Sequence, residues 1–260
     1  HMIKYIASDL DGTLLQGGAQ SLDPEIFDLI LQLREKGICF IAASGRQYYN
    51  LYNLFGPVQN DISYIAENGS LCIHQGSVIS RGIIERELGL RIIDACRKLP
   101  SCHCMLSCES RIYTESKDSR FLHYLHDILQ YDLEEVSDLH DITEPFLKLA
   151  MCDFGGTAEI EPFYKKQFSS EISVVTSGNI WVDFIAPGAH KGSGLVNLTK
   201  HLGLSPEDGI AFGDQYNDIE MLETAGIGCA MENCAPGVEK YADFQTDSVP
   251  KVLRELLKKI

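Results

Sequence analysis

Short apolar segments alternate with amphipathic ones along the chain. The first amphipathic segment is opened by Asp23-Pro24-Glu25 and closed by Gly37, a pattern typical of a helix with both ends marked. A strand, a helix and a second strand in this order predict a right-handed crossover and a parallel sheet. The apolar segments, which are typical of strands buried on both faces, are residues 3–8, 38–43, 62–66, 210–212 and 227–231. A further helix is expected at 249–259.

A change of pattern near residue 84 predicts a second domain. Residues 71–73 and 78–79, around Gln75-Gly76, favour a hairpin. From 84 to 187 the segments mix helix and strand patterns, with edge-like strands at 111–113 and 180–185, over a length too great for a loop. We therefore expect an α/β fold: a doubly wound parallel-sheet (Rossmann-like) core at 1–83 and 188–260, with an inserted α/β domain at 84–187.

Two carboxylates follow the first predicted strand directly. Side chains two apart on a strand share a face, so Asp9 and Asp11 are expected to point into the crevice where open α/β sheets bind ligands. Two ionised carboxylates so close together favour a divalent cation, a shared proton, or both. An acidic turn without chemistry is the alternative interpretation.

The composition narrows the class of protein. The chain has 260 residues and a formal net charge of −15, which disfavours binding to nucleic acid or to an anionic membrane surface. No apolar run approaches the roughly 20 residues of a membrane span, and no signal-peptide pattern precedes the first strand. His1, before Met2, is interpreted as a cloning remnant. We expect a cytoplasmic protein.

Nine cysteines are scattered along the chain, an odd number that favours free thiols over a disulfide framework. Cys102-His103-Cys104, with Cys108 nearby, suggests a zinc site. The one-residue gap is shorter than structural zinc spacing, and no matching second pair follows. Buried thiols that behave as small hydrophobic side chains are the favoured interpretation.

Three later stretches place polar groups at strand ends or helix starts. Ser44-Gly45-Arg46 follows the second strand, where the serine hydroxyl is either a helix N-cap or a donor to a phosphoryl oxygen. Lys191 lies at a predicted helix start, where a cation opposes the helix dipole, so it is either functional or a solvated surface charge. The stretch from Gly213 to Asp218 joins a strand to a helix and is either a capping cluster or a set of oxygen ligands suited to Mg²⁺.

In order along the chain, these stretches resemble the four motifs of the haloacid dehalogenase superfamily of phosphatases and phosphotransferases. Asp-x-Asp-Gly-Thr-Leu, from Asp9, is similar to the first motif, and Ser44 and Lys191 are similar to the second and third. Gly213-Asp214-x-x-Asn217-Asp218 resembles the fourth motif of Cof-like members. The position and size of the insertion resemble the cap of subclass IIB.

The resemblance implies a Mg²⁺-dependent phosphatase of small phosphorylated metabolites, such as sugar phosphates or phosphorylated cofactors. Asp9 is the implied nucleophile, and Asp11 is the implied general acid and then base. The implied metal ligands are Asp9, the main-chain carbonyl of Asp11, Asp214 and Asp218. The implied phosphoryl ligands are Ser44, Gly45, Lys191 and Asn217. Within the insertion, which would select the substrate, the candidate contacts are Ser177 and Asn179.

Two other functions stay open at this point. A phosphotransferase such as a hexose phosphomutase shares the first half-reaction but returns the phosphoryl group to sugar. A non-catalytic module that only senses a phosphorylated ligand would not need a nucleophile beside an acid, so Asp9 and Asp11 argue against it. We expect a monomer or homodimer.

Overall fold

The computed structural model describes residues 2–260, so His1 and its interpretation as a cloning remnant lie outside the described residues. The chain divides into two compact units. The first, here called the core unit, comprises the described residues up to Ser80 together with His190–Ile260. The second, the inserted unit, is Arg81–Ala189 and contains the expected insertion at 84–187.

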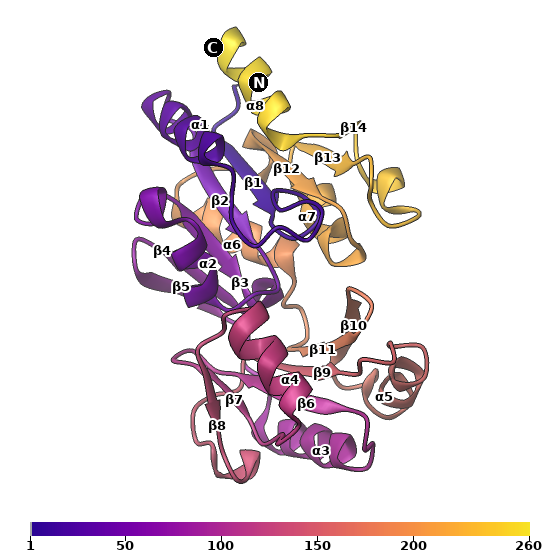
Figure 1. Cartoon of the computed structure of the whole chain (residues 1–260). Coiled ribbons are helices and arrows are strands. Elements are labelled where there is room, and N and C mark those ends of the chain that lie inside the picture. Colours follow the sequence, from indigo (N-terminus) through magenta and orange to yellow (C-terminus); the bar gives the residue numbers. More distant parts are fainter. Residues whose placement is uncertain (1) are drawn as a thin grey trace. The chain divides into compact units, whose positions relative to one another are not determined.

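The core unit is built on an eight-stranded sheet in the order β14-β13-β12-β1-β2-β3-β4-β5 (Figure 1). The pairs from β14 to β3 are parallel, and β3 pairs with β4 antiparallel, which confirms the predicted α/β class. The strands are β1 (Tyr5–Asp9), β2 (Cys39–Ala43), β3 (Ser63–Ala66), β4 (Leu71–His74), β5 (Ser77–Arg81), β12 (Gly209–Gly213), β13 (Ile227–Met231) and β14 (Phe244–Thr246).

Strand β1 is central, and its residues are buried on both faces. It pairs with β2 on one side, with Asp9 opposite Ala43, and with β12 on the other, with Ser8 opposite Phe212. The carboxyl ends of these three strands therefore meet at one edge of the sheet. This register brings Asp9, Ser44 and Asp214 to the same edge.

Five helices belong to the core unit: α1 (Pro24–Glu35), α2 (Tyr48–Leu54), α6 (Lys191–His201), α7 (Ile219–Thr224) and α8 (Val249–Lys259). Helix α1 begins as predicted, because the Asp23 carboxylate accepts a hydrogen bond from the Glu25 N–H at 2.9 Å. On the sheet face covered by α6 and α7, Leu195, Leu198 and Met221 pack against β1, β2 and β12 residues. Each such side chain contributes about 1.5–3 kcal/mol by burial. Short 3₁₀ helices lie at Gly56–Val58, Glu67–Gly69, Pro206–Asp208, Tyr216–Asp218 and Val238–Tyr241.

The inserted unit has its own six-stranded sheet, in the order β10-β11-β9-β6-β7-β8 (Figure 1). Its strands are β6 (His103–Ser107), β7 (Ile112–Thr114), β8 (Leu133–Glu135), β9 (Lys148–Cys152), β10 (Ser173–Ser177) and β11 (Trp181–Ile185). Its helices are α3 (Arg86–Arg97), α4 (Ser119–His123), a π-helical turn at Tyr124–Ile128, a 3₁₀ turn at Leu139–Asp141 and α5 (Ile160–Phe168). Side chains alternate between two apolar clusters, so each face of this sheet carries one cluster.

Two sequence predictions about the inserted unit need comment. The edge-like interpretation of 111–113 and 180–185 is wrong, because β7 lies between β6 and β8, and β11 lies between β10 and β9. Their polar residues made them resemble edges, but pairing partners are not a local property of sequence. Within residues 2–260 the cysteines form no disulfide, and the acidic group of the core unit is the sole cluster suited to a metal. Cys102 and Cys104 pack in one apolar cluster, whereas His103 stacks on Phe121 of the other, as strand alternation requires.

Within the described range, none of the helices has the length and apolar character needed to span a membrane.

Candidate active site

Lys191 joins two buried carboxylates at the carboxyl edge of the core sheet. Its ammonium nitrogen lies 2.7 Å from Asp9 Oδ1 and 2.6 Å from Asp218 Oδ1. Lys191 is the first residue of α6, where His190 caps the helix by accepting from the Ser193 N–H at 3.0 Å. A cation at this position opposes the helix dipole, and the two carboxylates offset that cost. Lys191 is only 1% exposed, so the alternative interpretation as a solvated surface charge is wrong.

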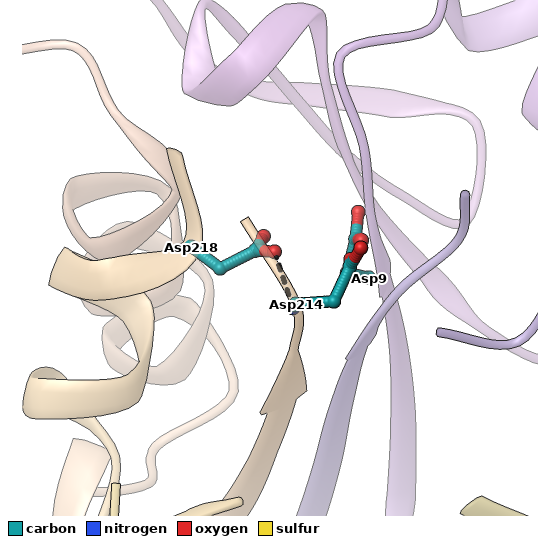
Figure 2. Close-up of side chains that lie close together, drawn as sticks. All are labelled: Asp9, Asp214 and Asp218. Atoms are coloured by element: carbon teal, nitrogen blue, oxygen red, sulfur yellow. Dashed lines mark hydrogen bonds between the residues drawn. The ribbon is translucent and has the colours of Figure 1, made fainter. Parts of the chain in front are cut away.

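The loop after β12 carries Asp218 and also the third carboxylate of the site, Asp214. Asp218 Oδ2 accepts hydrogen bonds from the backbone N–H groups of Asp214, at 2.9 Å, and Gln215, at 3.0 Å. Figure 2 shows the first of these bonds and the carboxylate of Asp218 turned toward Asp214 and Asp9. Gly213 allows this turn, because a β-carbon there would lie 2.5 Å from Cβ of Asp218. Asp218 thus shapes the loop and contributes an oxygen to the site.

Thr13 and Gly12 complete the acidic site, and the sequence patterns predicted no role for either residue. The Thr13 hydroxyl lies 3.0 Å from Asp214 Oδ1 and 3.3 Å from Asp9 Oδ2, so it can donate to either carboxylate. Gly12 has φ +82°, and a β-carbon there would lie 2.1 Å from Asp214 Oδ2. The Gly-Thr pair directly after the two acidic residues of the first motif was the available signal. These two residues let the first motif approach Asp214 closely.

Asp9, Asp214 and Asp218 form a group that can hold a metal ion (Figure 2). One carboxylate oxygen from each lies within 4.8 Å of the others, and all three side chains are buried. Hard oxygen donors and a surplus of two negative charges, after the single Lys191 ammonium is counted, suit a divalent cation such as Mg²⁺. The side chain of Asp11 lies outside this group.

Burial is the main cause that raises the pKa values of all three carboxylates. Burial raises the pKa of Asp9 to about 8; Lys191 opposes the rise and Asp214 adds to it. Burial and the charge of Asp9 raise the pKa of Asp218 to about 6, and burial also raises the pKa of Asp214. Although burial disfavours its charged form, Asp218 and Asp9 hold the pKa of Lys191 above its ordinary value. Without a cation, three carboxylates share one ammonium and favour extra protons.

Asp11 faces a different partner from the one expected. Its carboxylate makes a two-pronged ion pair with Arg46, with Nη2 2.6 Å from Oδ1 and Nε 2.8 Å from Oδ2. The alternation rule that placed Asp11 beside Asp9 applies only within a strand, and β1 ends at Asp9. The chain turns at residues 10–12, so the predicted crowding of Asp11 against Asp9 is replaced by the pair with Arg46.

The predicted phosphoryl ligands lie around the end of β2 and the acidic loop. Ser44 is buried, and its hydroxyl accepts from the Arg46 N–H at 3.0 Å. Asn217 Nδ2 donates to Asn68 Oδ1 at 2.9 Å, and Asn68 donates its backbone N–H to the Ser44 carbonyl at 3.0 Å. A β-carbon at Gly45 would lie 3.1 Å from Asn68 Oδ1. Asn68, in a left-handed conformation with φ 55°, therefore links Ser44, Gly45 and Asn217.

Comparison with known proteins assigns the chain to a family. The model of the haloacid dehalogenase-like hydrolases matches residues 6–252, nearly the whole chain. The chain belongs to the haloacid dehalogenase-like hydrolases. This match confirms the predicted membership of the haloacid dehalogenase superfamily. The predicted enzyme class, a phosphoric monoester hydrolase, is also confirmed at family level, because relatives are named phosphatases.

Among curated haloacid dehalogenase-like relatives, the Escherichia coli K12 protein named 5-amino-6-(5-phospho-D-ribitylamino)uracil phosphatase YbjI is 30% identical over 95% of this chain and 91% of that protein. The HMP-PP phosphatase of Citrobacter koseri is 28% identical over 90% of this chain and 86% of that protein. Both relatives are named for small phosphorylated compounds.

Solved structures agree on the family fold. A protein of Streptococcus mutans UA159 has a TM-score of 0.88 and 28% identity, covering 98% of this chain and 99% of that chain. A haloacid dehalogenase subclass IIB sugar phosphatase has a TM-score of 0.85 and 24% identity, covering 97% of this chain and 98% of that chain. The second likeness concerns the fold alone.

The two residues predicted as substrate contacts in the inserted unit of this family member lie near the β10–β11 turn. Ser177 ends β10, and its hydroxyl donates to Asp183 Oδ2 at 2.9 Å. Asn179 is exposed in the turn, where its carbonyl accepts from the Thr157 N–H at 3.1 Å. The Ser177 hydroxyl therefore hydrogen-bonds to the buried carboxylate of Asp183, whereas Asn179 contributes its backbone carbonyl to the structure of the turn.

Proposed function

We propose that this chain is a Mg²⁺-dependent phosphatase that hydrolyses monoesters of small metabolites through an aspartyl-phosphate at Asp9. The observation that carries the proposal is the position of Asp9: a buried carboxylate at the end of the central strand, paired with Lys191 and grouped with Asp214 and Asp218. Binding of a phosphorylated ligand alone does not require a carboxylate held in this way.

In the first half-reaction, an oxygen of Asp9 attacks phosphorus and the ester P–O bond breaks. Asp11 gives its proton to the leaving oxygen, which departs as an alcohol. In the second half-reaction Asp11 takes a proton from water, the water oxygen attacks phosphorus, and the bond to Asp9 breaks, which releases inorganic phosphate and restores the carboxylate. A bound Mg²⁺ would supply positive charge that offsets repulsion between the carboxylates and the phosphate.

The remaining polar groups of the site have consistent roles in this scheme. Lys191 keeps its proton between Asp9 and Asp218, so it holds Asp9 in place and neutralises a phosphoryl oxygen. Ser44, the Gly45 backbone and Asn217 would bind the other phosphoryl oxygens, with Asn68 holding them in register. Asp214 and Asp218 would hold the metal together with Asp9 and the Asp11 main-chain carbonyl.

Hydrolysis is preferred to phosphoryl transfer because the curated relatives are named phosphatases. A phosphomutase would use the same first half-reaction and would have to exclude water from the second. Release of free phosphate, against interconversion of sugar phosphate isomers, separates the two activities.

We further propose that the inserted unit recognises the part of the substrate beyond the phosphoryl group. Lys148 and Asp183, both buried, support this, together with Ser107, whose hydroxyl is buried without a hydrogen-bond partner among the described residues. Ser107 pairs with Lys148, and Asp183 with Ala150, so the three side chains share one sheet face. A cation, an anion and a hydroxyl there suit a leaving group with several hydrogen-bonding atoms. Asp183 also accepts a hydrogen bond from Ser177, the residue that the sequence predicted as a substrate contact.

The deciding experiment is a phosphate-release screen over sugar phosphates, nucleotides and phosphorylated cofactors, with and without Mg²⁺. The panel should include 5-amino-6-(5-phospho-D-ribitylamino)uracil and HMP-PP, because the relatives are named for these compounds. No release from any member by wild-type protein in Mg²⁺ would overturn the proposal. Whether the protein is cytoplasmic, and whether it is a monomer or homodimer, stay predictions.

A further inference from the structure

The ion pair between Arg46 and Asp11 joins a fixed group to an exposed one. The Arg46 side chain is 6% exposed, whereas that of Asp11 is 55% exposed. Arg46 Nη2 donates to Asp11 Oδ1 at 2.6 Å, and Nε donates to Oδ2 at 2.8 Å. Such two-pronged pairs fix the orientation of the carboxylate as well as its position.

Arg46 is itself held by its surroundings in the core unit. Its Nη1 donates to Asn50 Oδ1 at 3.0 Å, one turn along α2. Its backbone N–H donates to the Ser44 hydroxyl at 3.0 Å, and its carbonyl accepts from the Glu67 N–H at 3.0 Å. The Arg46 backbone is therefore anchored beside the proposed phosphoryl ligand Ser44, and the guanidinium is anchored to Asn50 of α2.

The backbone around Asp11 is closed into a tight turn. The Leu15 N–H donates to the Leu10 carbonyl at 2.8 Å, and the Gly12 N–H donates to the Leu15 carbonyl at 2.7 Å. These bonds fix the backbone but leave the Asp11 side chain free to rotate. Arg46 removes that rotational freedom. Each carboxylate oxygen has a second lone pair, so Asp11 can exchange a proton with a ligand while Arg46 remains bound.

We infer that Arg46 is the positioning residue for Asp11: it orients the exposed carboxylate so that one oxygen meets the leaving group of the substrate. This inference rests on the proposed phosphatase function. An alternative is that Arg46 only supports the chain between β2 and α2. The two roles differ in their dependence on the leaving group, because only the first acts through proton transfer.

The test compares two esters in Arg46→Gln and Arg46→Lys. A sugar phosphate needs its alkoxide protonated, whereas p-nitrophenyl phosphate has a leaving group that departs with little proton donation. We expect kcat/KM, which reports the steps up to formation of the aspartyl-phosphate, to fall about 10- to 100-fold on the sugar phosphate, since misoriented groups cost up to about 10²-fold. On p-nitrophenyl phosphate kcat/KM should fall less than about threefold, because formation of the aspartyl-phosphate from this ester needs little proton donation from Asp11. Arg34→Gln, which removes an exposed pair with Asp61, is the control and should change neither.

A double-mutant cycle with Asp11→Asn makes the test specific. If Arg46 acts through Asp11, Arg46→Gln should cost almost nothing further in the Asp11→Asn background. Equal losses of kcat/KM on both esters, or an undiminished loss in that background, would overturn the inference while leaving the phosphatase intact. A wild-type protein that hydrolyses neither ester would overturn both. Arg46→Lys keeps the positive charge but cannot make the two-pronged bond to Asp11. If Arg46→Gln does not fold, the same two outcomes are therefore tested with Arg46→Lys.

Discussion

The ammonium of Lys191 lies 2.7 Å from Asp9 Oδ1, and both side chains are buried. Lys191→Met should therefore lower kcat by at least about 10³-fold, because it removes the charge that holds Asp9 and offsets the phosphoryl group. Loss of one partner from a buried pair typically costs about 3–5 kcal/mol, and protonation of Asp9 or Asp218 should reduce that loss. Steady-state kinetics and urea unfolding measure the two effects. Lys200→Met, at an exposed position of α6, is the matched control.

Asp9→Asn should abolish turnover with the fold retained, because the amide cannot act as the nucleophile. The expected loss is several orders of magnitude in kcat. Phosphate release and circular dichroism measure activity and fold, and Asp28→Asn on the exposed side of α1 controls for the charge change. Near wild-type hydrolysis by a preparation free of other phosphatases would show that Asp9 is not the nucleophile.

Mg²⁺ should raise the melting temperature as well as support activity. Saturation at about 100 times Kd is worth about 2.7 kcal/mol of stability. Differential scanning fluorimetry in chelator and then in excess Mg²⁺ measures this, and Asp214→Asn should remove most of the shift because it removes a ligand. Ca²⁺ should support hydrolysis poorly, since its larger coordination sphere is looser. Full activity in excess chelator would contradict the metal proposal.

The ion-free protein should lose stability as the pH rises from about 4 to about 8. Burial raises the pKa of Asp9 from 3.8 to about 8, so the folded state binds a proton that the unfolded state releases across this window. The stabilising proton is fully present below pH 4 and is lost as the pH passes 8. Melting temperatures in chelator should fall with pH more steeply for wild type than for Asp9→Asn. Parallel curves would mean that Asp9 does not titrate in this window.

Substrate ranking should depend on the buried polar residues of the inserted unit. Lys148→Met and Asp183→Asn should change kcat/KM ratios among metabolites by about 10-fold or more, since a buried site discriminates strongly against ligands that do not match its polar side chains. Hydrolysis of p-nitrophenyl phosphate should change little. Lys165→Met, on exposed α5 surface, is the control. An unchanged ranking in both variants would place specificity in the core unit.

The local patterns of the sequence predicted much of the core unit. Strand β13 and helix α8 have the predicted bounds, and β1 ends at the expected acidic turn. Lys191 also begins its helix as predicted. These features depend on apolar runs, caps and turn residues within a few positions, which periodicity detects well.

Contacts between distant segments could not be read in this way. Arg46 is 35 positions from Asp11, and Asn68 is 149 positions from Asn217, so no local spacing links either pair. The polar appearance of β11 hid its internal place in the sheet for the same reason. Side-chain partners of this kind depend on which strands become neighbours in the sheet. The neighbours are determined by contacts between distant segments, which a local pattern does not contain.

The separation of Lys191 from Asp9 by 182 positions has a consequence for biosynthesis. A chain made from its N-terminus presents Asp9 first, and the residues that neutralise it follow only after the entire inserted unit. Domains tend to fold as they emerge, so the inserted unit can fold before the acidic group assembles. The acidic group can then assemble only after synthesis has passed Asp218, and nascent or truncated chains that end before residue 190 would carry Asp9 without Lys191, Asp214 and Asp218.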